Sequence, residues 1–264
     1  MKCPILNPIK FYDSTAMPNW STRYPHVDNT TQRSEYVIGQ SPVQFYKEFL
    51  SGQTIYLQFA KEVGDSEVLT VKKYNESTYL YDTYSTISAT DITPSGWVGD
   101  TMLSYEVLLT TGTYYVTFSD GFRSDTFTVI SNSDLVKKLV KVQYTHVEND
   151  YGCIFDNDYT FTNYFQGQFM PAPTENEIEA FESDRGENIK LQATPKRVFT
   201  LNINDIHQLY IDHVNMLFSL DTITVNGLEV ENIDAPQVEM VEFTDVCNIT
   251  VKLYLVDNDY YYQT

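Results

Sequence analysis

GTYYVTFSDGFRSDTFTVI, residues 112–130, is the clearest structural pattern in the chain. From Tyr114 onward, apolar residues alternate with their neighbours, as in a strand that buries one face. Asp120 and Gly121 then favour a tight turn with positive φ, and a second alternating run follows them. The stretch therefore predicts an antiparallel β-hairpin and indicates that the chain is mainly β.

Four more segments ahead of this hairpin are strand-like, namely residues 54–60, 68–74, 79–85 and 102–109. Short strands at regular spacing, separated by turn residues, are typical of two packed antiparallel sheets. We therefore expect residues 41–132 to form an Ig-like β-sandwich domain. Sandwiches of this kind serve many binding and structural functions, so the fold alone does not choose a function.

The second half, residues 133–264, predicts a β-rich α+β domain with one short helix, after a linker or helical turn at 131–138. Its strand-like runs are residues 139–147, 197–204, 238–244 and 248–256. Asn226-Gly227 is a strong hairpin signal between two further strands. Residues 148–196 are acidic and irregular and predict a long loop. Such loops are usually functional or ordered by a partner.

NDIHQLYIDHVNMLF, residues 204–218, is the only segment with a convincing helical pattern. His207 and His213 lie six positions apart, which places them roughly 120° apart around a helix axis. A shared metal needs ligands three or four positions apart. The apolar residues form one broad stripe, and Asn204 or Asp205 is a natural N-cap. The pattern favours a helix packed on a sheet over a metal or acid–base site.

Residues 1–40 have no sustained period and contain four prolines. The segment is nevertheless rich in aromatic residues, among them Phe11, Tyr12, Trp20 and Tyr24. We expect it to form an extended arm that lies across another surface. That surface is either its own domain or a neighbouring subunit. On the second interpretation these four side chains are candidate inter-subunit contacts.

The net charge of −19 is unevenly distributed. Residues 1–132 hold 9 basic and 14 acidic residues, whereas residues 133–264 hold 8 basic and 22 acidic ones. A surface this acidic repels phosphates, so we expect no direct nucleic-acid binding. The charge favours solubility first, and a basic protein partner or bound cations second.

The three cysteines, Cys3, Cys153 and Cys247, are widely spaced and form no CxxC pair. This disfavours a disulfide framework or a zinc site and favours assembly in a reducing cytoplasm. The N-terminus lacks the uninterrupted apolar run of a signal peptide. No segment approaches the roughly 20 apolar residues of a membrane span.

Nothing in the sequence marks an active site. Two Asp-Asn-Asp-Tyr strings could present carboxylates to Ca²⁺ through Asp156 and Asp158 or through Asp257 and Asp259. Neither string has the glycine and glutamate of an EF-hand loop, and such runs are common in turns. The sequence has no GxSxG motif, no phosphate-binding glycine loop and no supported Cys/His arrangement. We therefore expect a protein that is not an enzyme and that has no cofactor and no metal.

ESDRGENIKLQATPKRVFTLNINDIHQLYIDHVNMLFSLDTITVNGLEV, residues 182–230, resembles C-terminal halves of tail or baseplate-associated virion proteins of Bacteroidales tailed phages, including crAss-like phages. The shared features are an Arg-Gly turn, a basic strand, a short helix and the Asn226-Gly227 hairpin. The resemblance implies a structural tail hub or ring protein without an active site. Its partners would be copies of itself in a ring and other tail proteins. It would reside in the virion tail after assembly in the host bacterial cytoplasm.

Arg185 and Arg197 are scarce cations in the acidic half, and we add them to the candidate inter-subunit contacts. They could equally be solvated or serve local turns. A second hypothesis is a carbohydrate- or receptor-binding module of adhesin or fibre type, with Trp20 and Trp97 as stacking residues. A third is a glycan-degrading enzyme, because 36 acidic residues permit a carboxylate pair.

Overall fold

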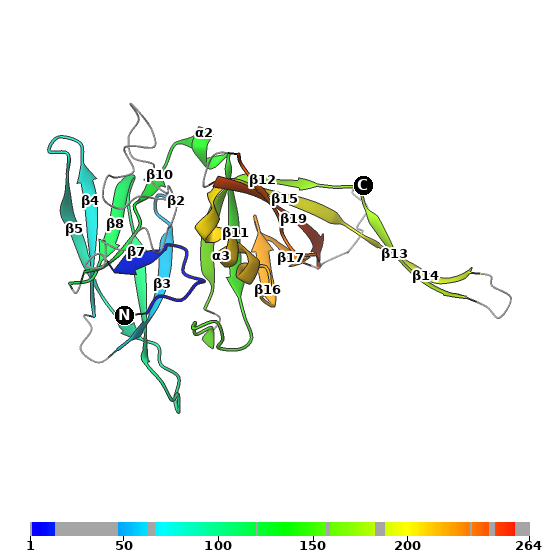
Figure 1. Cartoon of the computed structure of the whole chain (residues 1–264), viewed down its shortest axis with the longest axis horizontal. Helices are drawn as coiled ribbons and strands as arrows, with labels where there is room; N and C mark the ends of the chain where they lie inside the picture. Colours follow the sequence, from blue (N-terminus) through cyan, green and yellow to red (C-terminus); the bar gives the residue numbers. More distant parts are fainter. Residues whose placement is uncertain are drawn as a thin grey trace. The chain divides into compact units, whose positions relative to one another are not determined.

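The computed structural model describes residues 2–13, 47–62, 67–119, 121–156, 159–182, 188–232, 234–242 and 246–256. It is mainly β, with two short α-helices in the described ranges (Figure 1). The chain divides into two compact units. Unit 1 comprises residues 1–136 and 147–164, and unit 2 comprises residues 137–146 and 165–264. None of the helices in the described ranges has the length and apolar character needed to cross a membrane.

Unit 1 contains a seven-stranded sheet and a three-stranded sheet. The strands of the larger sheet are β1 (Phe11–Asp13), β2 (Lys47–Leu50), β4 (Val68–Asn75), β5 (Leu80–Ser88), β8 (Gly112–Thr117), β9 (Phe122–Ser124) and β10 (Phe127–Ile130). Those of the smaller sheet are β3 (Thr54–Lys61), β6 (Thr90–Asp91) and β7 (Thr101–Leu108). The strands predicted from alternation are thus confirmed. In the predicted hairpin of residues 112–130, the returning strand is divided into β9 and β10.

The two sheets of unit 1 meet through aromatic side chains. Phe59 of β3 is fully buried and lies 5.1 Å from Phe118 and 4.8 Å from Phe11, ring centroid to ring centroid. The finer prediction of an Ig-like arrangement is not shown. In particular, β2 and β10 pair in parallel, whereas the sheets of Ig domains are antiparallel.

Buried side-chain amides attach two non-strand segments to β3. The Asn7 side chain accepts a hydrogen bond from the Gln58 backbone N–H (2.8 Å) and donates one to the Gln58 carbonyl (2.6 Å). The Gln58 side chain does the same with the backbone of Ile154, at 2.8 and 2.7 Å. Each amide therefore imitates a neighbouring strand, and buried backbone groups obtain the partners that they require.

Unit 2 is built around a closed ring of six strands. These are β11 (Leu139–Thr145), β12 (Phe161–Pro171), which begins in unit 1, β15 (Val198–His207), β16 (Thr222–Val225), β17 (Leu228–Asn232) and β19 (Val246–Leu255). The ring closes because β19 pairs with both β17 and β15. A short strand, β18 (Gln237–Met240), pairs with β19 outside the ring. Closure leaves the ring strands without open edges along most of their length.

Two local features match the backbone requirements of the ring. Asn226 and Gly227 adopt positive φ values of 50° and 86° between the paired residues Val225 and Leu228. The predicted two-residue hairpin is therefore confirmed. A Cβ atom on Gly167 of β12 would lie only 1.9 Å from the carbonyl oxygen of Asn202. Glycine therefore permits the close approach of β12 to β15.

The predicted helix is shorter than expected. Residues 204–207 continue β15, a 3₁₀ turn η3 (Gln208–Tyr210) follows, and α3 spans Ile211–Leu217. The predicted cap was wrong, because Asp205 lies in a β-bulge with φ of 53° and donates its N–H to Asn248 Oδ1. Pairing of Ile206 and His207 with β19 overrides the helical pattern there. Residues 131–138 contain the expected helical turn, α2 (Ser133–Val136).

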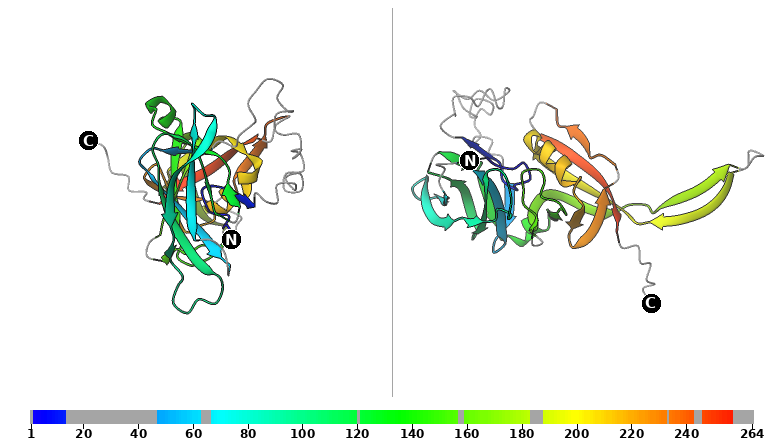
Figure 2. Two further views of the ribbon diagram at one scale, coloured as in Figure 1. Left: turned by 90° about the vertical axis from the view of Figure 1, so that its left-hand side faces the viewer. Right: turned by 90° about the horizontal axis from the view of Figure 1, so that it is seen from below.

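The predicted long loop at 148–196 was largely wrong. From residue 161 onward it contains β12, then β13 (Glu175–Glu182) and β14 (Asn188–Lys196). Together β13 and β14 form a separate two-stranded antiparallel sheet. Figure 2 shows this hairpin, in yellow-green, extending away from the ring of unit 2. Residues 147–156 remain irregular, as expected.

Candidate assembly site

The β13–β14 hairpin continues a pair of strands that belong to the closed ring. In the ring, β12 and β15 pair up to Pro171 and Phe199, and the Ala172 N–H donates to the Val198 carbonyl at 2.8 Å. After a short irregularity, pairing resumes at Glu175 and Lys196 in β13 and β14 and runs to the end of β13. The hairpin is thus an extension of the ring wall that passes beyond the ring.

No third strand joins this extension within the described ranges, since β13 pairs only with β14 and β14 only with β13. An isolated two-stranded hairpin is at best marginally stable in water, because it lacks a further strand or a packed face. The hairpin therefore depends on its attachment to the ring and on any surface that covers it.

Ionic contacts attach the base of the hairpin to β19. The Glu175 carboxylate accepts hydrogen bonds from Lys252 Nζ at 2.7 Å and from the Tyr254 hydroxyl at 2.8 Å. These bonds hold the pKa of Glu175 below its ordinary value, and the bond to Glu175 raises the pKa of Lys252. Both groups are partly exposed, so solvent and salt weaken this attachment.

Two lysines lie near the ring of Tyr254 at the same base. Lys196 Nζ lies 5.3 Å from the centre of the Tyr254 ring, and Lys252 Nζ lies 5.4 Å from it. Both distances are within cation–π range. Glu175 of β13 and Lys196 of β14 are paired with each other, and each of them contacts Tyr254. Both strands of the hairpin are therefore attached to β19.

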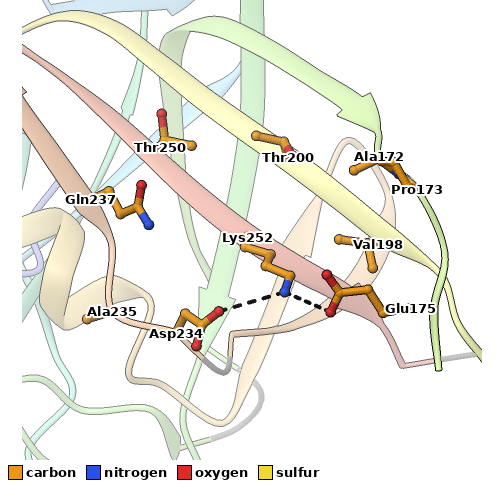
Figure 3. Close-up of a pocket in the computed structure, with 10 residues that line it drawn as sticks. All are labelled: Ala172, Pro173, Glu175, Val198, Thr200, Asp234, Ala235, Gln237, Thr250 and Lys252. Atoms are coloured by element: carbon orange, nitrogen blue, oxygen red, sulfur yellow. Dashed lines mark hydrogen bonds and ion pairs between the residues drawn. The ribbon is translucent and has the colours of Figure 1, made fainter. Parts of the chain in front are cut away.

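A cavity of about 240 Å³ lies beside this base (Figure 3). Its lining residues are Ala172, Pro173, Glu175, Val198, Thr200, Asp234, Ala235, Gln237, Thr250 and Lys252. Lys252 extends between Glu175 and the Asp234 carboxylate, which lies 3.9 Å away. The titratable groups of this cavity thus pair with one another, an arrangement that suits attachment of the hairpin.

Unit 1 contains a lysine, Lys47, that is buried, in contrast to the partly exposed Lys252. Lys47 of β2 is buried, and its Nζ donates a hydrogen bond of 2.5 Å to the Tyr164 carbonyl oxygen. Burial removes the ammonium group from water, which lowers the pKa of Lys47 well below its ordinary value. This lysine is a structural feature of unit 1 that sequence reasoning did not identify.

The predicted contact residues have different positions. Phe11 is buried in unit 1, where its ring packs on Phe59 and on Phe122. At this position the N-terminal segment covers its own unit. Tyr12 pairs with Arg123 through its backbone. Trp20, Tyr24 and Arg185 lie outside the described residues.

Arg197 connects β14 to β15, and its carbonyl oxygen accepts a hydrogen bond from the Leu255 N–H at 3.1 Å. It therefore lies close to the hairpin base along the chain. The inter-subunit role of Arg197 stays a prediction.

The histidines of the predicted helix lie on different elements. His207 ends β15, whereas His213 is fully buried in α3, with ring contacts to Tyr144 and Phe165. This matches the expectation of a packing role. In the part of the chain that the structure describes, no three His, Cys, Asp or Glu residues are grouped as a metal site. Asp156 accepts a hydrogen bond from the side chain of Asn149, while Asp158, Asp257 and Asp259 lie outside the described residues.

Sequence reasoning missed Glu175, Lys252 and Tyr254. Its one available signal was the alternation of glutamate with other residues in ENEIEAFE, residues 175–182, ahead of the Arg-Gly turn. That signal predicts a strand but not the contact with β19, which is 77 residues away for Glu175 and Lys252.

The sequence was compared with protein-family models and with curated proteins, and nothing matches it in either comparison.

Proposed function

We propose that the chain is a non-enzymatic structural subunit of a phage tail, a hub or ring component that assembles with copies of itself and with other tail proteins. The observation that carries the assembly role is the β13–β14 hairpin. It extends beyond a closed ring of strands and has no third strand in the described ranges. A neighbouring subunit would supply the surface that a lone hairpin lacks.

The assignment to a phage tail rests on the resemblance of residues 182–230 to tail-associated virion proteins. That segment contains the second strand of the hairpin, β15, α3 and the Asn226-Gly227 turn. The virion as its location and the host cytoplasm as the place of assembly follow from the same resemblance. The net charge of −19 supports protein partners over nucleic acid.

The test is the solution mass of the full chain and of a variant with a shortened hairpin. In the variant, Asn-Gly replaces residues 177–194, so that Asn176 and Pro195 remain paired across a two-residue turn. We expect the full chain to form an oligomer and the shortened chain to be monomeric, by light scattering after size exclusion. An equal number of subunits in the two proteins would contradict the proposal. Co-purification with other tail proteins of the phage tests the tail assignment separately.

A second candidate function, binding of a carbohydrate or receptor, is favoured by one tyrosine cluster. Tyr81 of β5 lies 5.3 Å from Tyr74 of β4 and 4.8 Å from Tyr115 of β8, and Arg123 lies 4.1 Å above the Tyr115 ring. All four are half-buried on a sheet of unit 1. Aromatic rings with polar neighbours suit sugar stacking. A glycan array with the wild type and with Tyr115→Ala and Trp97→Ala tests this, and absence of any glycan binding would exclude it.

A further inference from the structure

The strand β5 of unit 1 lies at the edge of its sheet (Figure 1). It has nine residues and, in the part of the chain that the structure describes, pairs only with β4. Residues 82–88 are exposed or half-buried throughout. They are mostly threonine, serine, tyrosine and isoleucine, with Asp82 as the sole charge. A long edge of this composition is a template for another strand unless it is covered.

Two lysines of β4 place positive charge on both faces of this edge. Lys72 Nζ donates a hydrogen bond of 2.7 Å to the Thr83 hydroxyl, so the ammonium group reaches over β5. Lys73 Nζ lies 5.4 Å from the centre of the Tyr84 ring. Adjacent residues of a strand point to opposite faces, so an added strand would meet a cation on each face.

The hairpin provides a strand of complementary charge. ENEIEAFE, the β13 sequence, contains four glutamates and no basic residue. NIKLQATPK, the β14 sequence, contains two lysines, no acidic residue, and Pro195, which lacks an N–H. β13 has eight residues, close to the nine of β5. On charge and hydrogen-bonding capacity, β13 is the better match for β5.

A shorter edge strand is β18, which pairs only with β19 within the described ranges. Residues 228–242 contain acidic side chains and no lysine or arginine. An acidic strand would be repelled there, and β18 has only four residues. This comparison favours β5 as the acceptor.

We infer that β13 of one copy pairs with β5 of the next copy and extends the seven-stranded sheet of unit 1 by the hairpin. This inference rests on the proposed assembly role and names the surface that completes it. Glu177 and Glu179 are two positions apart and therefore share one face of β13, where they would meet the lysine that reaches over the same face of the acceptor. Because donor and acceptor are different surfaces, the contact is head-to-tail and builds a ring or an open filament.

The experiment uses two variants of the full chain that are defective on opposite sides. The donor-defective variant has the shortened hairpin described above, and the acceptor-defective variant is Lys72→Glu/Lys73→Glu. We expect each to be monomeric alone, since the first lacks β13 and the second repels it. A 1:1 mixture should give a dimer, because one intact donor meets one intact acceptor. Lys138→Glu, at an exposed lysine before β11, is the matched control and should assemble as the wild type does.

Restoring the charges tests the pairing directly. The two lysine reversals in the acceptor-defective chain should weaken self-association by roughly tenfold or more. Adding Glu177→Lys/Glu179→Lys to that chain should restore it. Hydrogen exchange gives a second measurement that needs no acceptor variant. Amides of residues 82–88 should be protected in the wild-type assembly and should exchange roughly tenfold faster after hairpin shortening.

The outcomes separate the two levels of inference. If the shortened hairpin abolishes assembly but Lys72→Glu/Lys73→Glu assembles normally and residues 82–88 stay unprotected, the hairpin docks elsewhere. The β5 assignment then fails while the assembly role stands. If the shortened chain assembles as the full chain does, or the full chain is a monomer at every concentration, both fail.

Discussion

Unit 1 and unit 2 differ in the bonds that attach segments to their sheets. In unit 1 the neutral amides of Asn7 and Gln58 connect residues 2–13 and the Ile154 segment to β3, and all of these groups are buried. In unit 2 the hairpin base relies on Glu175 and Lys252, which are charged and partly exposed. Buried neutral bonds are costly to lose and insensitive to salt. Exposed ionic bonds are weak and respond to salt and pH, so the attachment of the hairpin base is the more easily weakened of the two.

The largest expected effect is at Gln58. Gln58→Leu keeps the approximate size of the side chain but leaves the buried N–H and carbonyl of Ile154 without their present partners. We expect a loss of about 2–5 kcal/mol in the free energy of unfolding, measured by urea denaturation of the full chain. Gln53→Leu, at an exposed glutamine in the turn before β3, is the control and should change it by less than about 0.5 kcal/mol. Equal effects at the two positions would show that the amide network contributes little.

The next effect concerns the buried lysine. The pKa of Lys47 is lower in the folded state than its ordinary value of 10.5. At pH values between the folded-state pKa and 10.5, Lys47 is protonated in the unfolded chain but not in the folded one. The free energy of unfolding therefore rises with pH, by up to about 1.4 kcal/mol per pH unit. Lys47→Met should remove this alkaline rise, whereas Lys138→Met should retain it. Denaturation at a series of pH values from neutral to alkaline measures the slope, and identical slopes in the two variants would refute the assignment.

A smaller effect is expected at the hairpin base. Lys252→Met removes the ammonium partner of Glu175 while keeping an apolar stem beside Tyr254. Backbone amides of β14 should exchange a few-fold faster, and high salt should produce a similar change in the wild type but little further change in the variant. Gln58→Leu leaves the contact between Glu175 and Lys252 in place, so its β14 amides should respond to salt as those of the wild type do. A salt response that persists unchanged in Lys252→Met would mean that other charges attach the hairpin.

The smallest effect is the titration of Glu175. Its pKa lies below the ordinary value of 4.5 in the folded state, because Lys252 and Tyr254 donate to the carboxylate. Its stabilising contribution is therefore present above pH 4.5 and is lost as the pH falls through the folded pKa. The ¹³C shift of the Glu175 carboxyl group should show this midpoint and should move upward in Lys252→Met. A midpoint that is the same in both proteins would contradict the contact.

The sequence predicted those parts of the fold that depend on local patterns. Alternation around Tyr114 and the Asn226-Gly227 turn are local signals, and both describe the structure correctly. Other parts of the fold join segments that are distant in the sequence. Examples are the parallel pairing of Lys47 with Phe127 and the closure of the ring between β15 and β19. No local pattern in these segments indicates which strand they pair with. At Asp205 the local preference for a helix N-cap is overridden, because the neighbouring residues pair with β19.

The candidate site was harder to predict than the fold. Glutamates at the alternate positions 175, 177 and 179 predict a strand, but Pro171 and Pro173 just before them favour a loop. The segment is a strand because it pairs with β14, and the sequence of residues 175–182 alone does not specify that pairing. The contact between Glu175 and Lys252 arises only because β12 and β15 lead the hairpin past β19. It therefore depends on ring closure, which no local pattern specifies.

The continuation of the β12–β15 pair into the hairpin has a consequence for how the arm can change in length. The ring is complete without the residues beyond Pro171 and Phe199, so residue pairs can be added to or removed from the hairpin without altering ring pairing. Each added pair would lengthen the arm by about 3.4 Å. Insertions of two residues per strand would also preserve which side chains share a face. In the proposed assembly, the spacing between neighbouring subunits would then change in steps with the length of the hairpin, while the ring stays the same.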